Sequence, residues 1–170
     1  ITTAAASHDS SPFDISGQQS YPHAVQFNND GTKMFVIGTG TGVGADAKDA
    51  VNEYTLSTAF DVSTASYVDG FDYRSQEGTA RALAFNNDGT KMFVSGLTGD
   101  DVNEYTLSTG FDVSTASFVD SYDVSSQDEG PSEVQFNIDG TKMFVLGYMN
   151  DNVYEYTLST GFDVSSASYV

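Results

Sequence analysis

The sequence contains no cysteine and no tryptophan among its 170 residues, and only three prolines. Without cysteine, the fold has no disulfide framework, and neither a thiolate nucleophile nor a thiolate metal site is available. No apolar run is as long as a membrane span requires, so we expect no insertion into a membrane. Hydrophobic residues still make up 39% of the chain and aromatic residues 13%, which is enough to build a core and argues against global disorder.

Basic residues are scarce too. Six Lys and Arg stand against 24 Asp and Glu, which gives a net charge of −18. A surface of this charge repels the phosphates of nucleic acids and of anionic membranes, so neither is an expected partner. Two interpretations of the acidic surface stay open: it keeps the protein soluble in salt, or it binds divalent cations such as Ca²⁺.

Two sequence blocks recur three times along the chain. The block FNxDGTKMFV stands at 27–36, 85–94 and 136–145, and the block VxEYTLST follows it at 51–58, 102–109 and 153–160. A fixed period of this size is the signature of a repeat architecture. We predict a single domain, 1–170, with repeats at about 13–70, 71–121 and 122–170, and with 1–12 as an N-terminal arm or closing strand.

Each repeat holds four short apolar runs of strand-like composition, none with the spacing of an amphipathic helix. In the second repeat the runs are 82–85, 91–94, 102–107 and 117–124. Asn-Asp-Gly-Thr between the first two runs predicts a tight hairpin turn, with glycine at positive φ. Four antiparallel strands in a unit of about 40 to 50 residues describe one blade of a β-propeller.

The residues also resemble a known group of repeats. Met143–Gly147 and Asp151–Thr157 look like the second and third strands of YVTN-type and NHL-like propeller blades, and Phe136–Gly140 is similar to their F-x-x-DG turn. The resemblance covers nearly the whole chain and implies an all-β propeller of three four-stranded antiparallel blades. Such propellers include binding modules, surface-layer proteins and hydrolases, so the fold does not decide the function. We expect an extracellular or cell-surface location.

Three blades are fewer than the four to eight of closed propellers, and an incomplete ring exposes apolar faces and strand edges. The last repeat stops part-way into its fourth strand at Ala167–Val170, and the N-terminal residues through Phe13–Ile15 match that strand. We therefore expect a homodimer that closes one six-bladed ring. The alternative is that the chain is an excised piece of a longer tandem protein.

Four sets of charged residues recur in every repeat. The Asp-Gly pairs contain Asp30, Asp88 and Asp139. The third strands carry Glu53, Glu104 and Glu155. The lysines after the turn are Lys33, Lys91 and Lys142. The Phe-Asp-Val-Ser segments contain Asp61, Asp112 and Asp163.

None of these sets has the pattern of a catalytic or metal site. A calcium loop needs spaced acidic ligands that end in a bidentate glutamate, so the Asp-Gly pairs favour a hairpin turn. Catalytic acids rarely repeat in every blade, so the glutamates are interpreted as surface or inter-blade residues and the lysines as solvated structural residues. The aspartates of the Phe-Asp-Val-Ser segments are expected to accept from backbone N–H groups two residues on.

The positions that break the repeat are more informative. In a propeller the first strand lines the central channel, and its start lies on the same face as the loop between the second and third strands. There the repeats carry His23, Arg81 and Ser132, followed by Ala24, Ala82 and Glu133. A glutamine recurs just upstream in each repeat. We predict a ligand-binding site at this channel mouth, formed by His23, Arg81, Glu133, Gln18, Gln76 and Gln127. The alternative is that these positions are exposed and vary in sequence without a functional reason.

Evidence for an enzyme is slight, because the chain has no G-x-S-x-G motif and no histidine pair with metal-ligand spacing. We predict a non-enzymatic binding or structural propeller whose ligand is a polar small molecule, a glycan or a cation, with no catalytic residue, assigned metal site or cofactor. One alternative is a calcium-dependent, lactonase-like hydrolase with an axial site; among the Glu, Asn and Asp ligands that this resemblance implies, Glu133 matches in kind. Another is a multivalent lectin with a pocket in each blade, against which the lack of tryptophan counts.

The charge leads to a first prediction. A net charge of −18 on a small domain is self-repulsive, and physiological salt screens charges over about 8 Å. The melting temperature measured by circular dichroism should therefore rise with NaCl concentration near neutral pH. Equal melting temperatures in low and high salt would refute the screening idea. A rise with CaCl₂ that NaCl of equal ionic strength does not reproduce would indicate a specific cation site.

Overall fold

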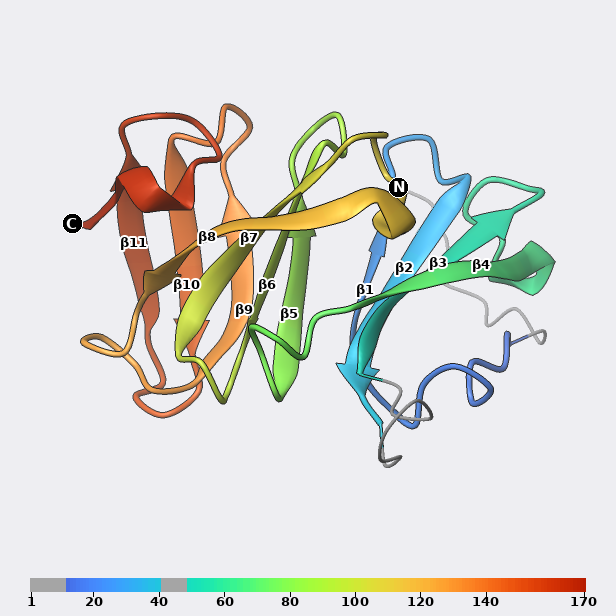
Figure 1. Ribbon diagram of the computed structural model, residues 1–170, viewed down its shortest axis with the longest axis horizontal. Coiled ribbons are helices and arrows are strands. Elements are labelled where there is room, and N and C mark those ends of the chain that lie inside the picture. The colour runs from blue at the N-terminus through green and yellow to red at the C-terminus, as the bar shows by residue number, and fades with distance from the viewer. Residues whose placement is uncertain (1–11, 41–48) are drawn as a thin grey trace, which may run out of the picture.

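The computed structural model describes residues 12–40 and 49–170, which form three four-stranded antiparallel sheets (Figure 1). The first sheet contains β1 (Tyr21–Phe27), β2 (Lys33–Thr39), β3 (Ala50–Leu56) and β4 (Ala65–Asp72). The second contains β5 (Ala80–Phe85), β6 (Lys91–Gly96), β7 (Asp101–Leu107) and β8 (Ala116–Asp123). The third contains β9 (Pro131–Phe136), β10 (Lys142–Gly147), β11 (Val153–Leu158) and β12 (Ala167–Tyr169). Except for Pro12, the predicted N-terminal arm lies outside the described residues.

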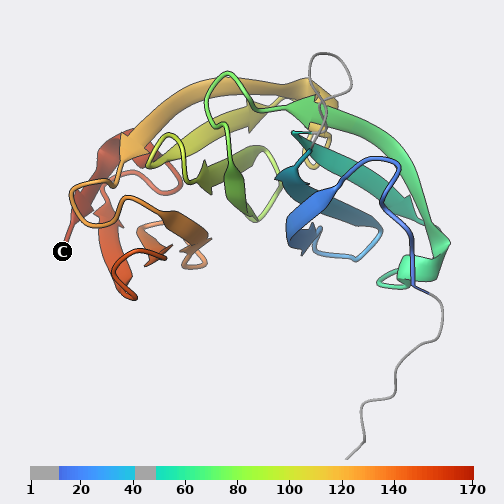
Figure 2. The same ribbon diagram turned by 90° about the horizontal axis from the view of Figure 1, so that it is seen from below.

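The three sheets stand side by side in an open arc (Figure 2). Their first strands, β1, β5 and β9, lie toward the concave side and contact one another, while β4 and β8 run along the convex side. Strand order within each sheet follows the chain, as in propeller blades. The predicted all-β propeller of three blades is thus confirmed, and we call the sheets the first, second and third blades.

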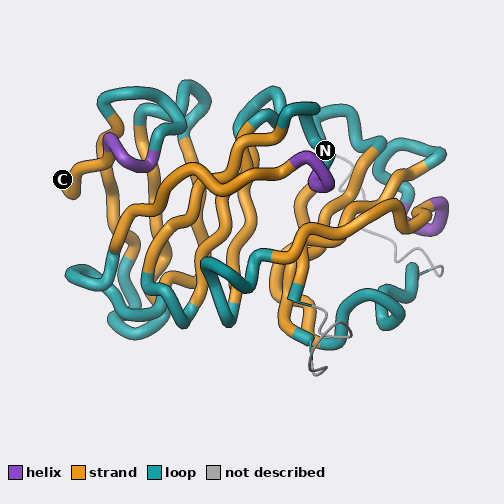
Figure 3. The backbone as a smooth tube through the Cα atoms, in the orientation of Figure 1, coloured by secondary structure: helices purple, strands orange, loops and turns teal. Residues whose placement is uncertain are grey.

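Short 3-10 turns are the only helical elements among the described residues, and each leads into the fourth strand of its blade (Figure 3). They are η2 (Val62–Thr64), η3 (Val113–Thr115) and η4 (Val164–Ser166). Asp61, Asp112 and Asp163 cap them by accepting from the backbone N–H two residues on, as the sequence predicted. Nothing helical in the described part of the chain has the length and apolar character needed to cross a membrane.

The hairpin between the first two strands of each blade is the tight turn expected from Asn-Asp-Gly-Thr. Gly89 has φ of 71°, and its counterparts in the other blades are nearly identical. Asp88 Oδ1 accepts from the Thr90 backbone N at 3.0 Å and from its hydroxyl at 2.6 Å. These bonds favour the carboxylate and lower the pKa of Asp88. The aspartate therefore caps its own turn, and the prediction of a hairpin turn is confirmed.

The core lies between the blades. Phe35 of the first blade packs against Phe85 and Phe111 of the second, with ring centroids 4.6 and 6.2 Å apart. The same geometry recurs one blade later, where Phe93 packs against Phe136 and Phe162 at 4.3 and 6.4 Å. A single sheet cannot bury both of its apolar faces, so each blade depends on its neighbours for stability.

A charged clamp runs beside each phenylalanine cluster. Lys91 Nζ donates to Glu104 Oε1 and to the backbone oxygen of Phe162, both at 2.6 Å. Glu104 Oε2 accepts from the Val164 backbone N at 3.0 Å. Lys33 and Glu53 make the same bonds to the second blade. Glu53 and Glu104 take the inter-blade role that was one of the two predicted, while Glu155 pairs with Lys142 of its own blade. Lys33 and Lys91 are partly exposed, but each also donates to a carbonyl of the next blade, which the solvated interpretation did not include.

We predict that Glu104→Ala destabilises the protein by about 2–4 kcal/mol, because it leaves Lys91 and the Val164 N–H without their buried acceptor. Urea denaturation followed by circular dichroism measures this cost. Glu129→Ala removes an exposed carboxylate of the second link and serves as the control, with an expected change within about 0.5 kcal/mol. Equal midpoints for the two variants would contradict the role of the clamp.

Candidate functional site

Each inner strand begins with a β-bulge. The regular pairing is interrupted at His23 in β1, at Arg81 in β5 and at Ser132 in β9. A bulge leaves one residue out of the ladder and re-aims its side chain. The three repeat-breaking residues therefore stand out of register, in equivalent places on the three blades.

The bulges lie beside the loops that join the second and third strands. The Leu97 backbone N donates to Thr79 O at 3.1 Å, and the Tyr148 backbone N donates to Gly130 O at 2.9 Å. These bonds tie each loop to the link that enters the first strand of its blade. The two segments thus share one face of the arc, as the sequence analysis expected.

Arg81 and His23 meet across the junction of the first and second blades. Arg81 Nη1 lies 2.9 Å from His23 Nδ1 and 3.2 Å from Nε2. A guanidinium can only donate, so one of the two imidazole nitrogens accepts from it and carries no proton. Burial, and then the positive charge of Arg81, lower the pKa of His23. Neutral His23 therefore acts as an acceptor that orients Arg81.

A cavity of about 370 Å³ lies on the other side of Arg81, at the junction of the second and third blades. Its lining residues are Arg81, Leu97, Ser132 and Tyr148. Ser132 Oγ donates to the Leu146 carbonyl at 3.1 Å, so its own oxygen remains available as an acceptor. Arg81 Nε is buried and has no partner among the described residues. The cavity thus combines apolar and aromatic walls with a guanidinium that has N–H groups to donate.

The structure does not bring the other predicted residues to Arg81. Glu133 Oε1 accepts from Gln135 Nε2 at 2.8 Å, and no hydrogen bond or ion pair joins it to Arg81 in the described part of the chain. The recurring glutamines lie in the turns of the links, where Gln127 Oε1 accepts from the Tyr156 hydroxyl at 3.2 Å. Their backbone N–H groups bond the residue three positions earlier in all three links, at Gln18, Gln76 and Gln127. This geometry gives the glutamines a structural place, and a ligand-binding role for them and for Glu133 stays a prediction.

The residues that follow Gln76 and Gln127 are buried loop anchors. Glu77 accepts from the backbone N–H groups of Thr98 and Gly99 at 3.1 and 3.2 Å. Asp128 accepts from Met149 and Asn150 in the same way, at 3.2 and 2.8 Å. These carboxylates hold the loops of the channel mouth in place and are occupied by backbone donors.

Sequence reasoning missed two residues that line the cavity, Leu97 and Tyr148. Both follow a glycine that ends the second strand, and Thr39 occupies the same place in the first blade. Thr39 Oγ1 lies 3.4 Å from His23 Nε2. These three positions differ between the repeats, so the criterion that selected His23 and Arg81 would have found them. Among the described residues, no group of three or more His, Cys, Asp or Glu side chains could hold a metal ion.

Comparison with protein-family models finds no match, and comparison with curated protein sequences finds none either. Solved structures do match. A candidate 6-phosphogluconolactonase of Bacteroides fragilis superposes with a TM-score of 0.60 at 14% identity, over 88% of this chain and 37% of that protein. The periplasmic gluconolactonase of Pseudomonas aeruginosa gives 0.58 at 17%, over 87% and 37%. The β-propeller domain of a Myceliophteria thermophila protein gives 0.56 at 10%, over 81% and 38%. At these identities the likeness shows the propeller fold, and the chain spans less than half of each neighbour.

The contact between Arg81 and His23 predicts how His23 titrates. Its pKa in the folded protein should lie below the usual 6.5, so the unfolded chain takes up the proton first. The contribution of this group to stability is then full above pH 6.5 and is lost as the pH falls below it. Two-dimensional NMR of the imidazole resonances measures the pKa, with His8→Gln to remove the second histidine, which lies outside the described residues. In Arg81→Gln the pKa should rise toward 6.5. A titration midpoint that Arg81→Gln leaves unchanged would show that the contact has no influence.

Proposed function

We propose that the chain binds a small, uncharged, oxygen-rich molecule of the sugar-lactone class at the cavity beside Arg81. The observation that carries this proposal is the arrangement of Arg81 itself: a bulge aims it, neutral His23 holds it, and the cavity lies next to it. A guanidinium has five N–H donors, and His23 accepts only one of them. The remaining donors suit hydroxyl and carbonyl oxygens.

The charge of the chain favours an uncharged ligand. With 24 acidic against six basic residues, the overall field opposes the approach of an anion, although Arg81 alone would attract one. Leu97 and Tyr148 give the cavity apolar walls, and ligand sites commonly combine such walls with a few fixed polar groups. The C–H face of a sugar ring suits the exposed Tyr148 ring, while its oxygens reach Arg81.

Hydrolysis of such a lactone is the second candidate, and it is supported by the names of two structural neighbours, a gluconolactonase and a candidate 6-phosphogluconolactonase. N–H donors that hold a lactone carbonyl also stabilise the oxyanion that forms when water attacks it. His23 directs its accepting nitrogen at Arg81, so it positions the guanidinium and does not take a proton from water. The calcium-dependent form of this candidate gains no support, since the described residues hold no metal-ligand cluster.

The two candidates are separated by one pair of measurements. Binding of gluconolactam, a stable lactone analogue, is followed by the backbone ¹H–¹⁵N resonances of Leu97 and Tyr148, which line the cavity and which the Arg81→Ala variant retains. Hydrolysis of glucono-1,5-lactone is followed in a pH-stat above the spontaneous rate. We expect saturable binding that Arg81→Ala abolishes. Arg74→Ala is the matched control, because Arg74 pairs with Asp72 away from the cavity.

Each outcome has a distinct meaning. Binding without hydrolysis supports a non-enzymatic binding propeller, and hydrolysis that Arg81→Ala removes supports the lactonase candidate. Binding that survives Arg81→Ala favours a lectin-like site in each blade. Absence of any response of the cavity residues to the analogue, in a protein that melts normally, overturns the proposed ligand class.

A further inference from the structure

Every blade has two different apolar faces. One carries the positions of Phe35, Ile37 and Val51, and we call it the outgoing face, because it packs on the blade that follows. The opposite face, which we call the receiving face, carries the positions of Leu83, Met92 and Val94 in the second blade. Outgoing and receiving faces meet at both junctions within the chain.

The outgoing face of the third blade has no neighbour among the described residues. It carries Phe144, Leu146 and Val153, in the places of Phe35, Ile37 and Val51. Leu146 is 43% exposed and Val153 67% exposed, whereas Ile37 and Val51 are fully buried. An apolar surface of this kind marks a site of contact with another surface.

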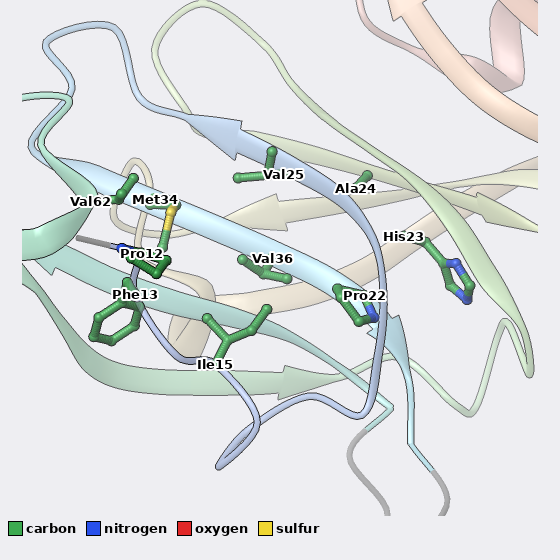
Figure 4. Close-up of a pocket in the computed structure, with 10 residues that line it drawn as sticks. All are labelled: Pro12, Phe13, Ile15, Pro22, His23, Ala24, Val25, Met34, Val36 and Val62. Carbon is green, nitrogen blue, oxygen red and sulfur yellow. The ribbon is translucent and has the colours of Figure 1, made fainter. Parts of the chain in front are cut away.

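The receiving face of the first blade, at the other end of the arc (Figure 2), is only partly covered, by Phe13 and Ile15 of the same chain. It forms an apolar cavity of about 390 Å³, whose walls include Val25, Met34, Val36 and Val62 (Figure 4). Val25 is 53% exposed, although Leu83, its counterpart in the second blade, is fully buried. The cavity lies where the outgoing face of a preceding blade would pack.

The aromatic rings at the two ends also complement each other. Phe27 and Phe60 of the first blade have ring centroids 5.6 Å apart. The matching pair in the second blade, Phe85 and Phe111, is 5.5 Å apart and receives Phe35 of the blade before it. The pair on the first blade lacks such a third ring, and Phe144 on the third blade is a half-buried ring without a following blade.

At the end of the arc, only the lysine–glutamate pair of the charged clamp is present. Lys142 pairs with Glu155 as in the other blades, but the Glu155 side chain is 39% exposed, while that of Glu104 is 3% exposed. The clamp lacks the backbone carbonyl and N–H that the next blade would supply. On the first blade the corresponding groups are Phe60 O and Val62 N, for which the described residues contain no partner.

We infer that the third blade of one chain packs on the first blade of a second copy. Leu146 enters the apolar cavity, Phe144 joins the Phe27–Phe60 pair, and the Lys142–Glu155 clamp binds Phe60 O and Val62 N. The second copy is favoured because its first blade matches the apolar, aromatic and polar parts of this contact at once. Two such contacts close a ring of six blades, within the four to eight of closed propellers, whereas three copies would make nine.

One feature distinguishes this junction from those within the chain. Asn29 Nδ2 donates to Asn87 O at 2.5 Å, and Asn87 Nδ2 donates to Ile138 O at 2.6 Å. The third blade has Ile138 in the place of these asparagines, so this hydrogen bond is missing at the contact between copies. The junction between copies is therefore the weaker one, and dissociation should separate intact chains before blades come apart.

Charge complementation tests the head-to-tail arrangement. We expect light scattering of the unmodified chain to give twice the chain mass over a dilution series. Leu146→Lys and Val25→Asp should each give a monomer. In a dimer of identical variants, both junctions between copies contain the substituted residue, so each junction would bury an unpaired charge. Mixed together, the two variants should recover the dimer, since one junction is then unmodified and the other pairs Lys with Asp. Val119→Lys, on the exposed outer strand β8, is the control and should stay dimeric.

Circular dichroism of each variant verifies folding, which both substitutions should tolerate because the two side chains are already half exposed in the single chain. A folded, monomeric unmodified chain at all concentrations overturns the proposal. So does a dimer that both single variants retain, which would indicate a different contact surface. Recovery of the dimer only with a separate protein that supplies a blade would assign the face to another partner and also contradict a second copy.

Discussion

The junction between blades is the contact on which the rest of the structure depends. A phenylalanine from one blade enters between two phenylalanines of the next, and a lysine–glutamate pair beside it holds a carbonyl and an N–H of that blade. Hydrophobic burial and satisfied backbone groups thus act at the same place. Because both parts come from the repeated blocks, the junction is reproduced wherever two repeats follow each other.

This constraint explains why some positions repeat and others vary. Residues in the junction meet equivalent surroundings in each blade, so Phe35 and Phe93 are identical, as are Glu53 and Glu104. Packing between blades restricts the residue at the bulge of each inner strand much less, because its side chain leaves the ladder toward the channel mouth. Variation there changes the chemistry of the mouth without changing how the blades pack.

Much of the fold followed from local signals. Strands, the glycine turns and the aspartate caps each depend on a few neighbouring residues, and all were predicted from them. The residues at the predicted starts of the first two repeats, Phe13 and Phe71, also have equivalent surroundings: Phe13 packs edge-on against Tyr54 at 5.5 Å, and Phe71 packs against Tyr105 at 5.1 Å. Such contacts are predictable in a repeat protein, because equivalent positions in successive repeats have equivalent neighbours.

The location of the candidate site could be predicted from the sequence, but the set of residues that meet there could not. Its start-of-strand position was visible as a break in the repeat, yet the contact between Arg81 and His23 joins residues 58 positions apart and depends on a register shift that no local pattern encodes. Glu133 lies one residue past the bulge, in the regular ladder, which explains why it bonds Gln135 and not Arg81. The sequence did not reveal Glu77 and Asp128 as loop anchors, because burial against loop N–H groups is a property of the folded loop.

The position of the site also separates the two proposals physically. Arg81 contacts His23 across the first junction and lines its cavity across the second, so every residue that defines the site belongs to one chain. The surfaces that would join two copies, the outgoing face of the third blade and the receiving face of the first, lie at the opposite ends of the arc. A charge at Leu146 should therefore separate the copies without altering Arg81, and the loss of Arg81 should leave the junction between copies intact. Ligand binding and assembly then depend on different parts of the same repeat, one on the start of the inner strands and the other on the apolar faces at the two ends of the arc.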